Sequence, residues 1–305
     1  MLGNLFSYKK GYAHNVLNIL GFKIKIKSKN IDNYRVKILI AYHKKTPLLK
    51  NDICIPIHCG RKLAYKKQLI DSTFKNDYQW LTNNMIGDDT GDNISYLNNK
   101  FNELTALYWA WKNYDKIGNP DVIGFMHYRT IFNLQSYPTY ETIYLDSCGY
   151  KNKSLLELID NKNNFLCTCF GKTSKNMEVS YKEMEQYGAD FKFYETFVNI
   201  LKDKYKKDYK DLVKYNNQNI IGPFKQMFIL PKEEFFSYCE WMFPKILELE
   251  NLMKDYPYEK KQKSSRSIGW LCEHITAFYF WRLAKSCNHK ELNCYRPYLE
   301  EGVNG

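Results

Sequence analysis

The chain has 305 residues, of which 44% are hydrophobic and 16% aromatic, enough for one large domain with a sizeable core. It lacks the run of about 18 or more apolar residues that a membrane-spanning helix needs, and it lacks the pattern of a secretory signal. We therefore expect a cytosolic protein. Its nine cysteines are an odd number and mostly lie in apolar runs, so we expect reduced thiols, with Cys167 and Cys169 buried in a strand rather than binding zinc.

The formal net charge of +12 is typical of proteins that bind nucleic acid or an anionic surface. Here, however, the lysines are spread over the whole chain, which is also crowded with Asn, Ile and Tyr, as chains from low-GC genomes tend to be. No nucleic-acid-binding motif accompanies them. We therefore expect no nucleic-acid partner, and a small anionic ligand such as a nucleotide diphosphate suits the charge equally well.

The N-terminal segment, residues 1–35, differs in character from the rest. Residues 5–30 mix apolar side chains with lysines and contain no acidic residue. Phe22, Ile24 and Ile26 alternate with three lysines, which predicts a strand with one apolar and one cationic face. Two interpretations stay open: an edge hairpin packed on the domain, or an appendage (residues 1–30) that touches anionic lipid. We place the domain boundary between 35 and 36, with the main domain spanning 36–305.

The first part of the main domain alternates strands with a helix. Residues 36–41 and the run within 52–60 are short apolar segments typical of buried strands. Apolar residues at spacings of three and four predict an amphipathic helix over about 97–114. A turn at Asn119 and Pro120 leads into a buried strand over 122–126. This alternation predicts the α/β class.

The second part of the chain is predicted to be largely helical. In chain order we expect a strand within 163–170, helical structure over 180–205 interrupted near Gly188, a strand over 226–230 stopped by Pro231, a helix over 233–253 and a largely buried helix over 265–285.

Polar side chains follow two of the predicted strands at the point where each ends. Tyr42 and His43 follow the first strand, and His127, Tyr128 and Arg129 follow the strand over 122–126. Ligands of open α/β sheets bind beyond the carboxyl ends of the strands. Arginine binds diphosphate bidentately, tyrosine stacks on a base or a sugar, and histidine donates to phosphate or hydroxyl oxygens. We therefore expect these residues to bind a ligand together.

An acidic loop, "GDDTGDNIS" (87–95), precedes the predicted helix. Its carboxylates, Asp88, Asp89 and Asp92, suit sugar hydroxyls, a divalent cation or the capping of the first helical turn. Capping needs one of them, so we expect a ligand role for at least Asp92. The spacing does not match an EF-hand.

Several ordered motifs together carry a family resemblance. "GDNISYLNNKFNELTALYWAWKN", "DVIGFMHYRT", "QMFILPKEEFFSYCEWMF" and "RSIGWLCEHI" resemble bacterial glycosyltransferases of capsule and O-antigen biosynthesis, including galactofuranosyltransferases. The resemblance covers residues 36–285. It implies a variant GT-A fold, related to the Rossmann fold, in which a central mixed sheet is flanked by helices and the C-terminal part is largely helical.

The resemblance also implies an inverting transfer, which needs a general base and cations that stabilise the departing diphosphate. Glu273 is expected to be the base, because burial in its apolar helix would raise its pKa. The alternative is a structural pairing with Arg266 or His274. The donor-binding residues are expected to be Tyr42, His43, Asp88, Asp89, Asp92, Asn93, His127, Tyr128, Arg129 and Arg266.

The metal and the acceptor side are less determined. GT-A enzymes often carry Asp-x-Asp after a central strand to hold a divalent cation, whereas here His127 and its neighbours occupy that place. Cationic side chains would then replace the metal, although Mn²⁺ or Mg²⁺ at His127 or Asp92 is left open. Asp190 is assigned to the acceptor side, where an expected histidine is absent. Glu103 is expected to orient a sugar hydroxyl or Arg129, or else to be a solvated helix residue.

The leading hypothesis is a glycosyltransferase that moves galactofuranose or galactose from a nucleotide diphosphate sugar to a growing capsular or lipopolysaccharide glycan, free or lipid-linked. Such an enzyme would work in the cytoplasm or at the inner face of the cytoplasmic membrane. The alternative is a noncatalytic, membrane-associated scaffold of a polysaccharide assembly complex. An RNA-binding protein is a third hypothesis, which only the charge supports.

Overall fold

The computed structural model describes residues 6–9, 14–19, 22–27, 34–134, 148–160, 165–172, 175–222, 225–257 and 266–296. Three N-terminal strands, β1 (Phe6–Lys9), β2 (His14–Ile19) and β3 (Phe22–Lys27), form a separate antiparallel sheet. The strand predicted around Ile24 is therefore present. The side chains of residues 1–30, on which the lipid interpretation rests, lie outside the described part.

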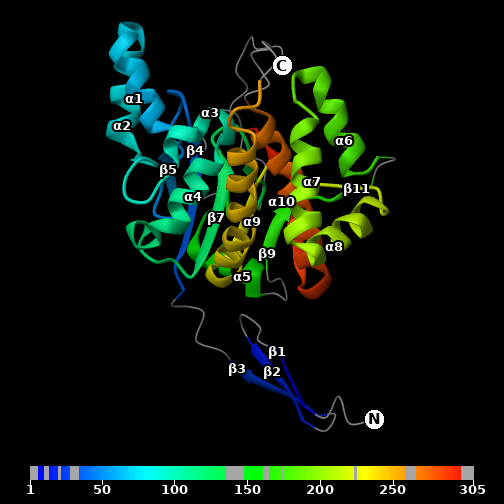
Figure 1. Ribbon diagram of the computed structural model, residues 1–305. Coiled ribbons are helices and arrows are strands. Elements are labelled where there is room, and N and C mark those ends of the chain that lie inside the picture. The colour runs from blue at the N-terminus through cyan, green and yellow to red at the C-terminus, as the bar shows by residue number, and fades with distance from the viewer. Residues whose placement is uncertain are drawn as a thin grey trace.

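A seven-stranded mixed sheet forms the centre of the main domain (Figure 1). Its order is β13-β9-β12-β7-β4-β5-β6, and all strands run in one direction except β12, which is antiparallel to both neighbours. The strands are β4 (Val36–Tyr42), β5 (Cys54–His58), β6 (Ile86–Gly87), β7 (Val122–His127), β9 (Phe165–Thr168), β12 (Phe228–Pro231) and β13 (His289–Leu292). Two small pairs flank it: β8 (Ile131–Phe132) with β14 (Cys294–Tyr295), and β10 (Gly171–Lys172) with β11 (Ile220–Ile221).

Helices cover the sheet and make up most of the chain after β9, so the prediction of an α/β fold with a largely helical C-terminal part is confirmed. The α-helices are α1 (Arg61–Ile70), α2 (Lys75–Asn84), α3 (Asn98–Phe101), α4 (Leu104–Lys112), α5 (Asn152–Asp160), α6 (Met177–Glu183), α7 (Lys192–Lys204), α8 (Lys206–Asn216), α9 (Lys232–Leu252) and α10 (Ser267–Ser286). The 3₁₀ turns are η2 (Ser72–Phe74), η3 (Ser95–Leu97), η4 (Tyr114–Ile117) and η5 (Met184–Tyr187). None of the described helices combines the length and apolarity needed to cross a bilayer.

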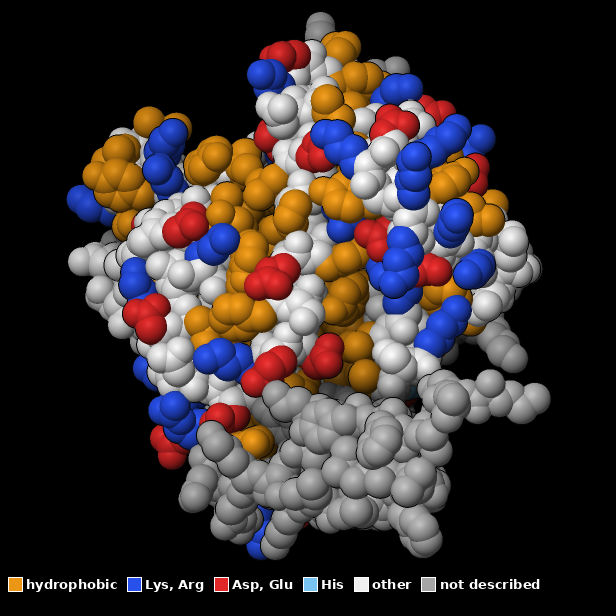
Figure 2. Space-filling model, turned by 60° about the horizontal axis from the view of Figure 1, so that its bottom comes forward, with side chains coloured by type: hydrophobic (Ala, Val, Ile, Leu, Met, Phe, Trp, Pro, Cys, Tyr) orange, Lys and Arg blue, Asp and Glu red, His pale blue; other side chains and the backbone are white. Residues whose placement is uncertain are grey.

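The basic side chains do not form one stripe on the face shown in Figure 2. Lys and Arg lie there among acidic and hydrophobic side chains. A protein that follows a nucleic-acid backbone usually gathers its positive charge along one face or helix. On this face the basic side chains are therefore distributed rather than gathered in one stripe.

Both faces of the sheet are buried, which explains the continuous apolar runs of its strands. In β4, Leu39 and Ala41 belong to one core, whereas Ile38 and Ile40 belong to the other. The first core lies under α3, α4 and α6 to α10, and the second lies under α2 and α5. Successive side chains of a strand point to opposite faces, so each apolar run supplies both cores.

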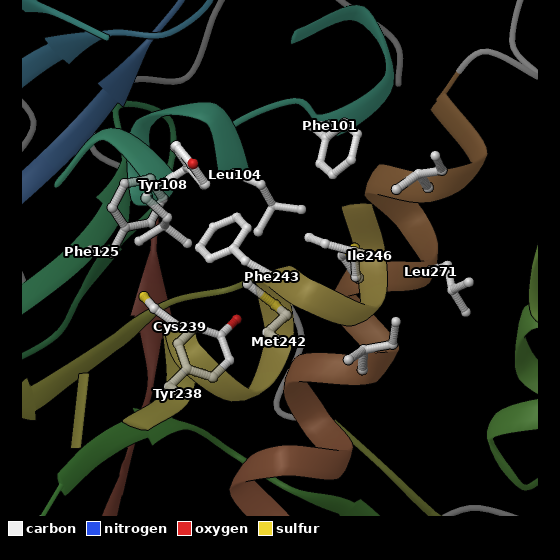
Figure 3. Close-up of a cluster of buried hydrophobic side chains, with 14 of the residues drawn as sticks. Phe101, Leu104, Tyr108, Phe125, Tyr238, Cys239, Met242, Phe243, Ile246 and Leu271 are labelled. Carbon is white, nitrogen blue, oxygen red and sulfur yellow. The ribbon is translucent and has the colours of Figure 1, made fainter. Parts of the chain in front are cut away.

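The larger core is built around α4 and α9, which cross the sheet side by side (Figure 1). Trp111 stacks on Phe243 with ring centroids 5.6 Å apart, and Tyr108 meets Phe243 edge-on at 5.1 Å. Burying one such aromatic side chain stabilises the fold by about 1.5–3 kcal/mol. Figure 3 shows the surrounding side chains, of which Phe101, Leu104, Tyr108, Phe125, Tyr238, Cys239, Met242, Phe243, Ile246 and Leu271 are labelled.

A buried ion-pair network joins α8, α9 and α10. Asp208 lies 3.2 Å from Lys245 Nζ and 2.7 Å from Arg282 Nη1, and it accepts a hydrogen bond from Trp241 Nε1. Burial lowers the pKa of Lys245 below its usual range, and the Asp208 charge opposes this shift. Loss of Asp208 would leave a buried ammonium without its counterion, so this network fixes how the three helices pack.

Two of the sequence predictions need correction. The helix predicted over 97–114 is interrupted, because Asn102 has a positive φ of 50° and separates α3 from α4. All nine cysteines are free thiols, and Cys167 is buried in β9, but Cys169 is exposed because the strand ends at Thr168. The remaining predicted strands and helices lie within a few residues of their expected bounds.

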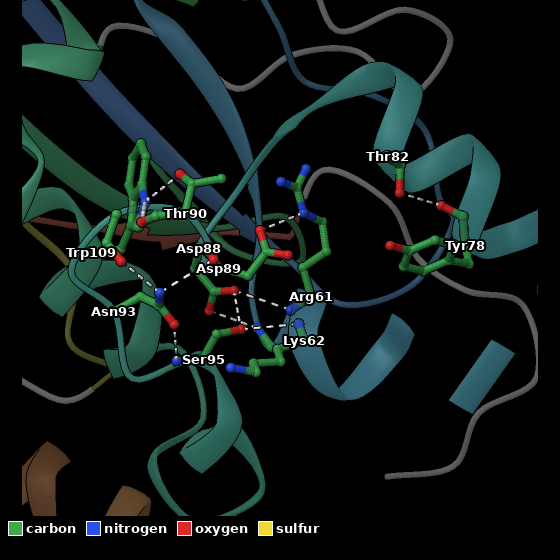
Figure 4. Close-up of polar contacts among 12 residues, drawn as sticks. Arg61, Lys62, Tyr78, Thr82, Asp88, Asp89, Thr90, Asn93, Ser95 and Trp109 are labelled. Atoms are coloured by element: carbon green, nitrogen blue, oxygen red, sulfur yellow. Dashed lines mark hydrogen bonds and ion pairs between the residues drawn. The ribbon is translucent and has the colours of Figure 1, made fainter. Parts of the chain in front are cut away.

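The acidic loop is organised around Asp88, which is fully buried. Its carboxylate accepts hydrogen bonds from Gly60 N (2.7 Å), Arg61 N (3.0 Å), Ser95 Oγ (2.6 Å) and Thr105 Oγ1 (2.5 Å). Figure 4 shows the Asp88 carboxylate beside Arg61 and Ser95. Burial raises the pKa of Asp88, and the hydrogen bonds oppose this shift. One carboxylate thus ties the start of α1 to α4, and it fixes the loop.

Replacing this carboxylate should therefore destabilise the fold. We expect Asp88→Ala to lower the free energy of unfolding by about 2–4 kcal/mol, since each buried donor left without an acceptor costs about 1–3 kcal/mol. Urea denaturation followed by circular dichroism measures the change. Asp92→Ala is the control, because Asp92 is exposed and accepts one hydrogen bond, from Tyr108. Equal unfolding midpoints for the two variants would contradict the structural role of Asp88.

Candidate active site

The carboxyl ends of β4, β5 and β7 bring three histidines to one edge of the sheet. In the parallel register, Ala41 of β4 lies beside His127 of β7, and Tyr42 lies beside His58 of β5. His43 follows β4 directly. The prediction that the polar ends of β4 and β7 meet is confirmed. His58 was not assigned from sequence, although it ends a strand in the same way.

Cations surround His43 at this edge. Partial desolvation, followed by the charges of Arg129 and Arg266 and then those of Lys44 and His127, lowers the pKa of His43 to about 4. The imidazole is therefore neutral at pH 7, although part of the residue is open to solvent. Arg129 and Arg266 are both exposed. Two guanidinium groups near one neutral imidazole form a site that favours an anion.

The two tyrosines at this edge form a stacked pair that contacts His43 and Arg129. Tyr42 is fully buried and Tyr128 is 3% exposed. Their rings stack on each other at 5.2 Å, and the Tyr128 ring also meets His43 edge-on at 5.4 Å and the Arg129 guanidinium at 5.5 Å. The expectation that either ring stacks on a base or a sugar does not fit this geometry, because protein already covers them. They position His43 and Arg129 instead.

Glu273 projects from α10 beside Glu103, which precedes α4. Burial, followed by the Glu103 charge, raises the pKa of Glu273 to about 7, while Lys225 and Arg266 oppose the shift. The predicted rise in pKa is thus present, with a second cause that the sequence did not indicate. His274 hydrogen-bonds Ser180 and the backbone of Trp270, so it does not neutralise Glu273. A carboxyl group that titrates near neutrality suits proton transfer at pH 7.

The backbone of Lys225 connects Glu273 to His127. Lys225 N donates to Glu273 Oε2 (3.1 Å), and Lys225 O accepts from His127 Nε2 (2.5 Å). Glu103 Oε1 lies 3.8 Å from the same His127 nitrogen. Lys225 and Gln226 have positive φ values of 72° and 51°, which cost free energy in residues other than glycine. Such strain at a cluster of ionisable groups is typical of functional sites.

Close packing between α10 and the α3–α4 turn sets the positions of Glu273 and Glu103. A Cβ at Gly269 would overlap the Asn102 side-chain amide, so a larger residue there would displace the Asn102 side chain. Arg266 Nε donates to Asn102 Oδ1 at 3.3 Å. Glu103 follows Asn102, and Glu273 lies one turn beyond Gly269. The contact therefore brings Arg266, Glu103 and Glu273 near one another.

The acidic loop is held mainly by contacts within the protein. Asp88 is satisfied by four protein donors, and Asp89 pairs with Arg61 Nε at 2.7 Å. The Asn93 side chain bonds the loop backbone, and Asp92 accepts from Tyr108 OH. Figure 4 shows the loop fixed by these contacts. The donor-binding role predicted for these residues is therefore not supported by their geometry; they shape the loop.

The residues considered for a metal are not assembled into a metal site. Within the part of the chain that the structure describes, no group of three or more His, Cys, Asp or Glu side chains is placed to hold an ion. His127 Nε2 donates to a carbonyl, so this nitrogen carries a proton and is not a ligand. Asp92 is held by Tyr108, and its own carbonyl accepts from Asn113, near the other end of α4. The pairing of His127 with Asp92 around one ion does not fit.

Asp190 lies next to the start of α10. Its backbone N–H donates to Ser267 Oγ at 3.0 Å, while its carboxylate accepts from Lys192 N and caps α7. A cavity of about 410 Å³ opens beyond it between α6, α7 and α8, lined in part by Phe191 and Tyr194. Asp190 is therefore close to Arg266 in the fold, but its side chain serves the helix.

Sequence reasoning missed three residues of the site. His58 is 1% exposed, and its Nδ1 has no hydrogen-bond partner in the described structure; burial and then Arg61 lower its pKa to about 3. Lys225 acts through its backbone, which no side-chain pattern reveals. Gln226 is also 1% exposed, and both polar atoms of its side chain lack partners there.

The fold resembles that of a solved glycosyltransferase structure. A solved structure of WbbM, described as a bifunctional glycosyltransferase in its apo form, superimposes with a TM-score of 0.68 and 26% sequence identity. The match covers 86% of this chain and 45% of the WbbM chain, so this protein spans less than half of WbbM. The seven-stranded mixed sheet, its flanking helices and the helical C-terminal part constitute a GT-A-like α/β fold. No curated protein matches the chain.

A family match covers most of the main domain. Residues 37–286 match the family described as "Domain of unknown function (DUF4422)", which begins at β4 and ends with α10. The match takes in both strand ends, the α3–α4 turn and Glu273. The protein is a member of the DUF4422 family.

Proposed function

We propose that the protein is an inverting glycosyltransferase that uses a nucleotide diphosphate sugar. The observation that carries the proposal is the proximity of a carboxyl group with a pKa of about 7, Glu273, to the cation Arg266, which together with Arg129 lies near His43. A single displacement at an anomeric carbon needs both kinds of group. Similarity to WbbM, itself described as a glycosyltransferase, supports the same class of reaction.

In the proposed reaction, Glu273 in its ionised form takes the proton of the acceptor hydroxyl. The hydroxyl oxygen forms a bond to the anomeric carbon while the bond from that carbon to the diphosphate oxygen breaks, and the diphosphate leaves with the electron pair. Arg129 and Arg266 stabilise the charge that develops on the diphosphate. His43 is neutral and donates a hydrogen bond to the donor, and Glu103 raises the pKa of the base.

The proposal also covers the identity of the transferred sugar and of the acceptor. The motifs that resemble galactofuranosyltransferases favour galactofuranose or galactose as the sugar and a capsular or lipopolysaccharide glycan, free or lipid-linked, as the acceptor. Asp190 lies beside the first turn of α10, so the acceptor is proposed to enter from that side. Such an enzyme would act in the cytoplasm or at the inner face of the cytoplasmic membrane.

Donor binding is tested by thermal shift. We expect UDP-galactose or UDP-galactofuranose to raise the melting temperature of the full chain, because a ligand that binds only the folded state stabilises it. GDP- and dTDP-sugars test which nucleobase the site accepts, and a CMP-sugar tests whether a diphosphate is needed. Each sugar nucleotide is measured with and without Mn²⁺ or Mg²⁺. The absence of a shift with any nucleotide would contradict the proposal and favour the noncatalytic scaffold.

Arg129 should contribute directly to diphosphate affinity. We expect Arg129→Gln to weaken binding of the stabilising nucleotide at least about tenfold, since hydrogen bonds to charged groups contribute about 1.5–3 kcal/mol. Arg35→Gln is the matched control, because Arg35 is an exposed arginine at the opposite end of β4. Isothermal titration measures both. Equal affinities for the two variants would remove Arg129 from the donor site.

The pH dependence of transfer tests Glu273 and Glu103 together. The base must be ionised, so kcat/KM should fall about tenfold per pH unit below the pKa of about 7. Glu273→Gln should lower kcat at least about a hundredfold at all pH values without weakening donor binding. Glu103→Gln removes a negative charge beside Glu273, so it should move the acidic limb of the profile to lower pH. An unchanged profile in Glu103→Gln would show that the two carboxyl groups are not coupled.

A further inference from the structure

The hairpin of α1, η2 and α2 (residues 61–84) exposes an unusual amount of apolar surface. α1 contains no buried residue, and Leu81 is the buried residue of α2. Tyr65, Leu69 and Ile70 are 49%, 64% and 88% exposed. Helices of this length depend on packing for their stability. The large apolar side chains in the last two turns of α1 face water, so this face of the helix is not covered by other residues of the described structure.

Basic side chains share this surface with the apolar ones. Lys62, Tyr65, Lys66 and Leu69 follow the i, i+3, i+4, i+7 spacing that places residues on one face of a helix. Residues 61–84 carry five basic side chains (Arg61, Lys62, Lys66, Lys67 and Lys75) and two acidic ones (Asp71 and Asp77), a net charge of +3. The exposed face of α1 is thus both apolar and cationic.

The hairpin leaves the sheet at the same edge as the candidate active site. α1 begins three residues after the end of β5, and the Arg61 backbone donates to Asp88. Figure 1 shows α1 and α2 projecting beyond the sheet at the upper left, at the end to which the parallel strands run. The N-terminal segment, in contrast, joins β4 at the opposite edge.

We propose that α1 docks on an anionic lipid surface, with Tyr65, Leu69 and Ile70 entering the headgroup region and Lys62 and Lys66 facing the lipid charges. A helix with apolar and cationic side chains together suits such an interface. A second copy of the chain fits less well, because a symmetric contact brings two surfaces of the same positive charge together. The proposal rests on the hairpin alone and stands independently of the proposed reaction.

Sedimentation of the full chain with lipid vesicles tests this surface. We expect binding to vesicles that contain about a third phosphatidylglycerol, and little binding to phosphatidylcholine alone. Lys62→Gln with Lys66→Gln should weaken binding by about fivefold per lysine. Leu69→Gln with Ile70→Gln should weaken it at least about tenfold, without loss of stability, because both side chains are exposed.

Matched controls separate this hairpin from the rest of the surface. Lys207→Gln with Lys210→Gln removes two exposed lysines of α8, and Leu252→Gln removes an exposed leucine of α9. Both should bind vesicles like the unaltered protein. A third variant, with Lys23, Lys25 and Lys27 changed to Gln, tests the N-terminal segment.

Three outcomes would overturn the proposal. The first is the absence of anionic vesicle binding by the unaltered chain. The second is binding that depends on the N-terminal lysines and is unchanged in both hairpin variants. The third is a dimer, detected by analytical ultracentrifugation, that dissociates when Leu69 and Ile70 are replaced, since the same apolar face would then bind a second copy. Nucleotide thermal shifts distinguish these results from failure of the proposed reaction.

Discussion

The approach of α10 to the α3–α4 turn is the constraint on which the candidate site depends. Gly269 admits the Asn102 side chain where any other residue would displace it, and Asn102 itself adopts a positive φ. Glu103 and Glu273 follow these two residues on their respective elements. Two carboxyl groups are thereby held close enough for one to raise the pKa of the other. Helix packing, rather than any local motif, creates the proposed base.

The same constraint explains why the site contains opposing charges. Burial and Glu103 favour the protonated form of Glu273, whereas Lys225 and Arg266 favour its ionised form. The result lies near neutrality, where a carboxyl group can both accept and release a proton. A fully buried carboxylate without these cations would stay protonated at pH 7, and one without Glu103 would be a weaker base.

Sequence patterns predicted the parts of this structure that arise from local periodicity. The buried strands β4 and β7 and the helices α9 and α10 follow from their apolar spacing, and the meeting of His43 with Arg129 follows from the parallel sheet. The break at Asn102 was not predicted, and its packing against Gly269, which is distant in sequence, was not visible in the local pattern. The contacts of Asp88 in the acidic loop were missed for a related reason: three of its donors, Gly60, Arg61 and Thr105, are distant from it in sequence.

The direction of the strands also relates the site to the hairpin. Parallel strands send the loops that follow them to one edge, so the segment after β5 and the residues after β4 and β7 project to the same side. An exposed apolar and cationic helix on that side would bring a lipid surface to the level of Arg129 and Glu273. A helix placed at the amino edge would hold the site away from such a surface. A lipid-linked acceptor would therefore be reached most directly through the hairpin, which the connectivity of the sheet places at the edge of the site. The N-terminal segment joins β4 at the other edge, so its point of attachment would not bring a lipid surface to the site.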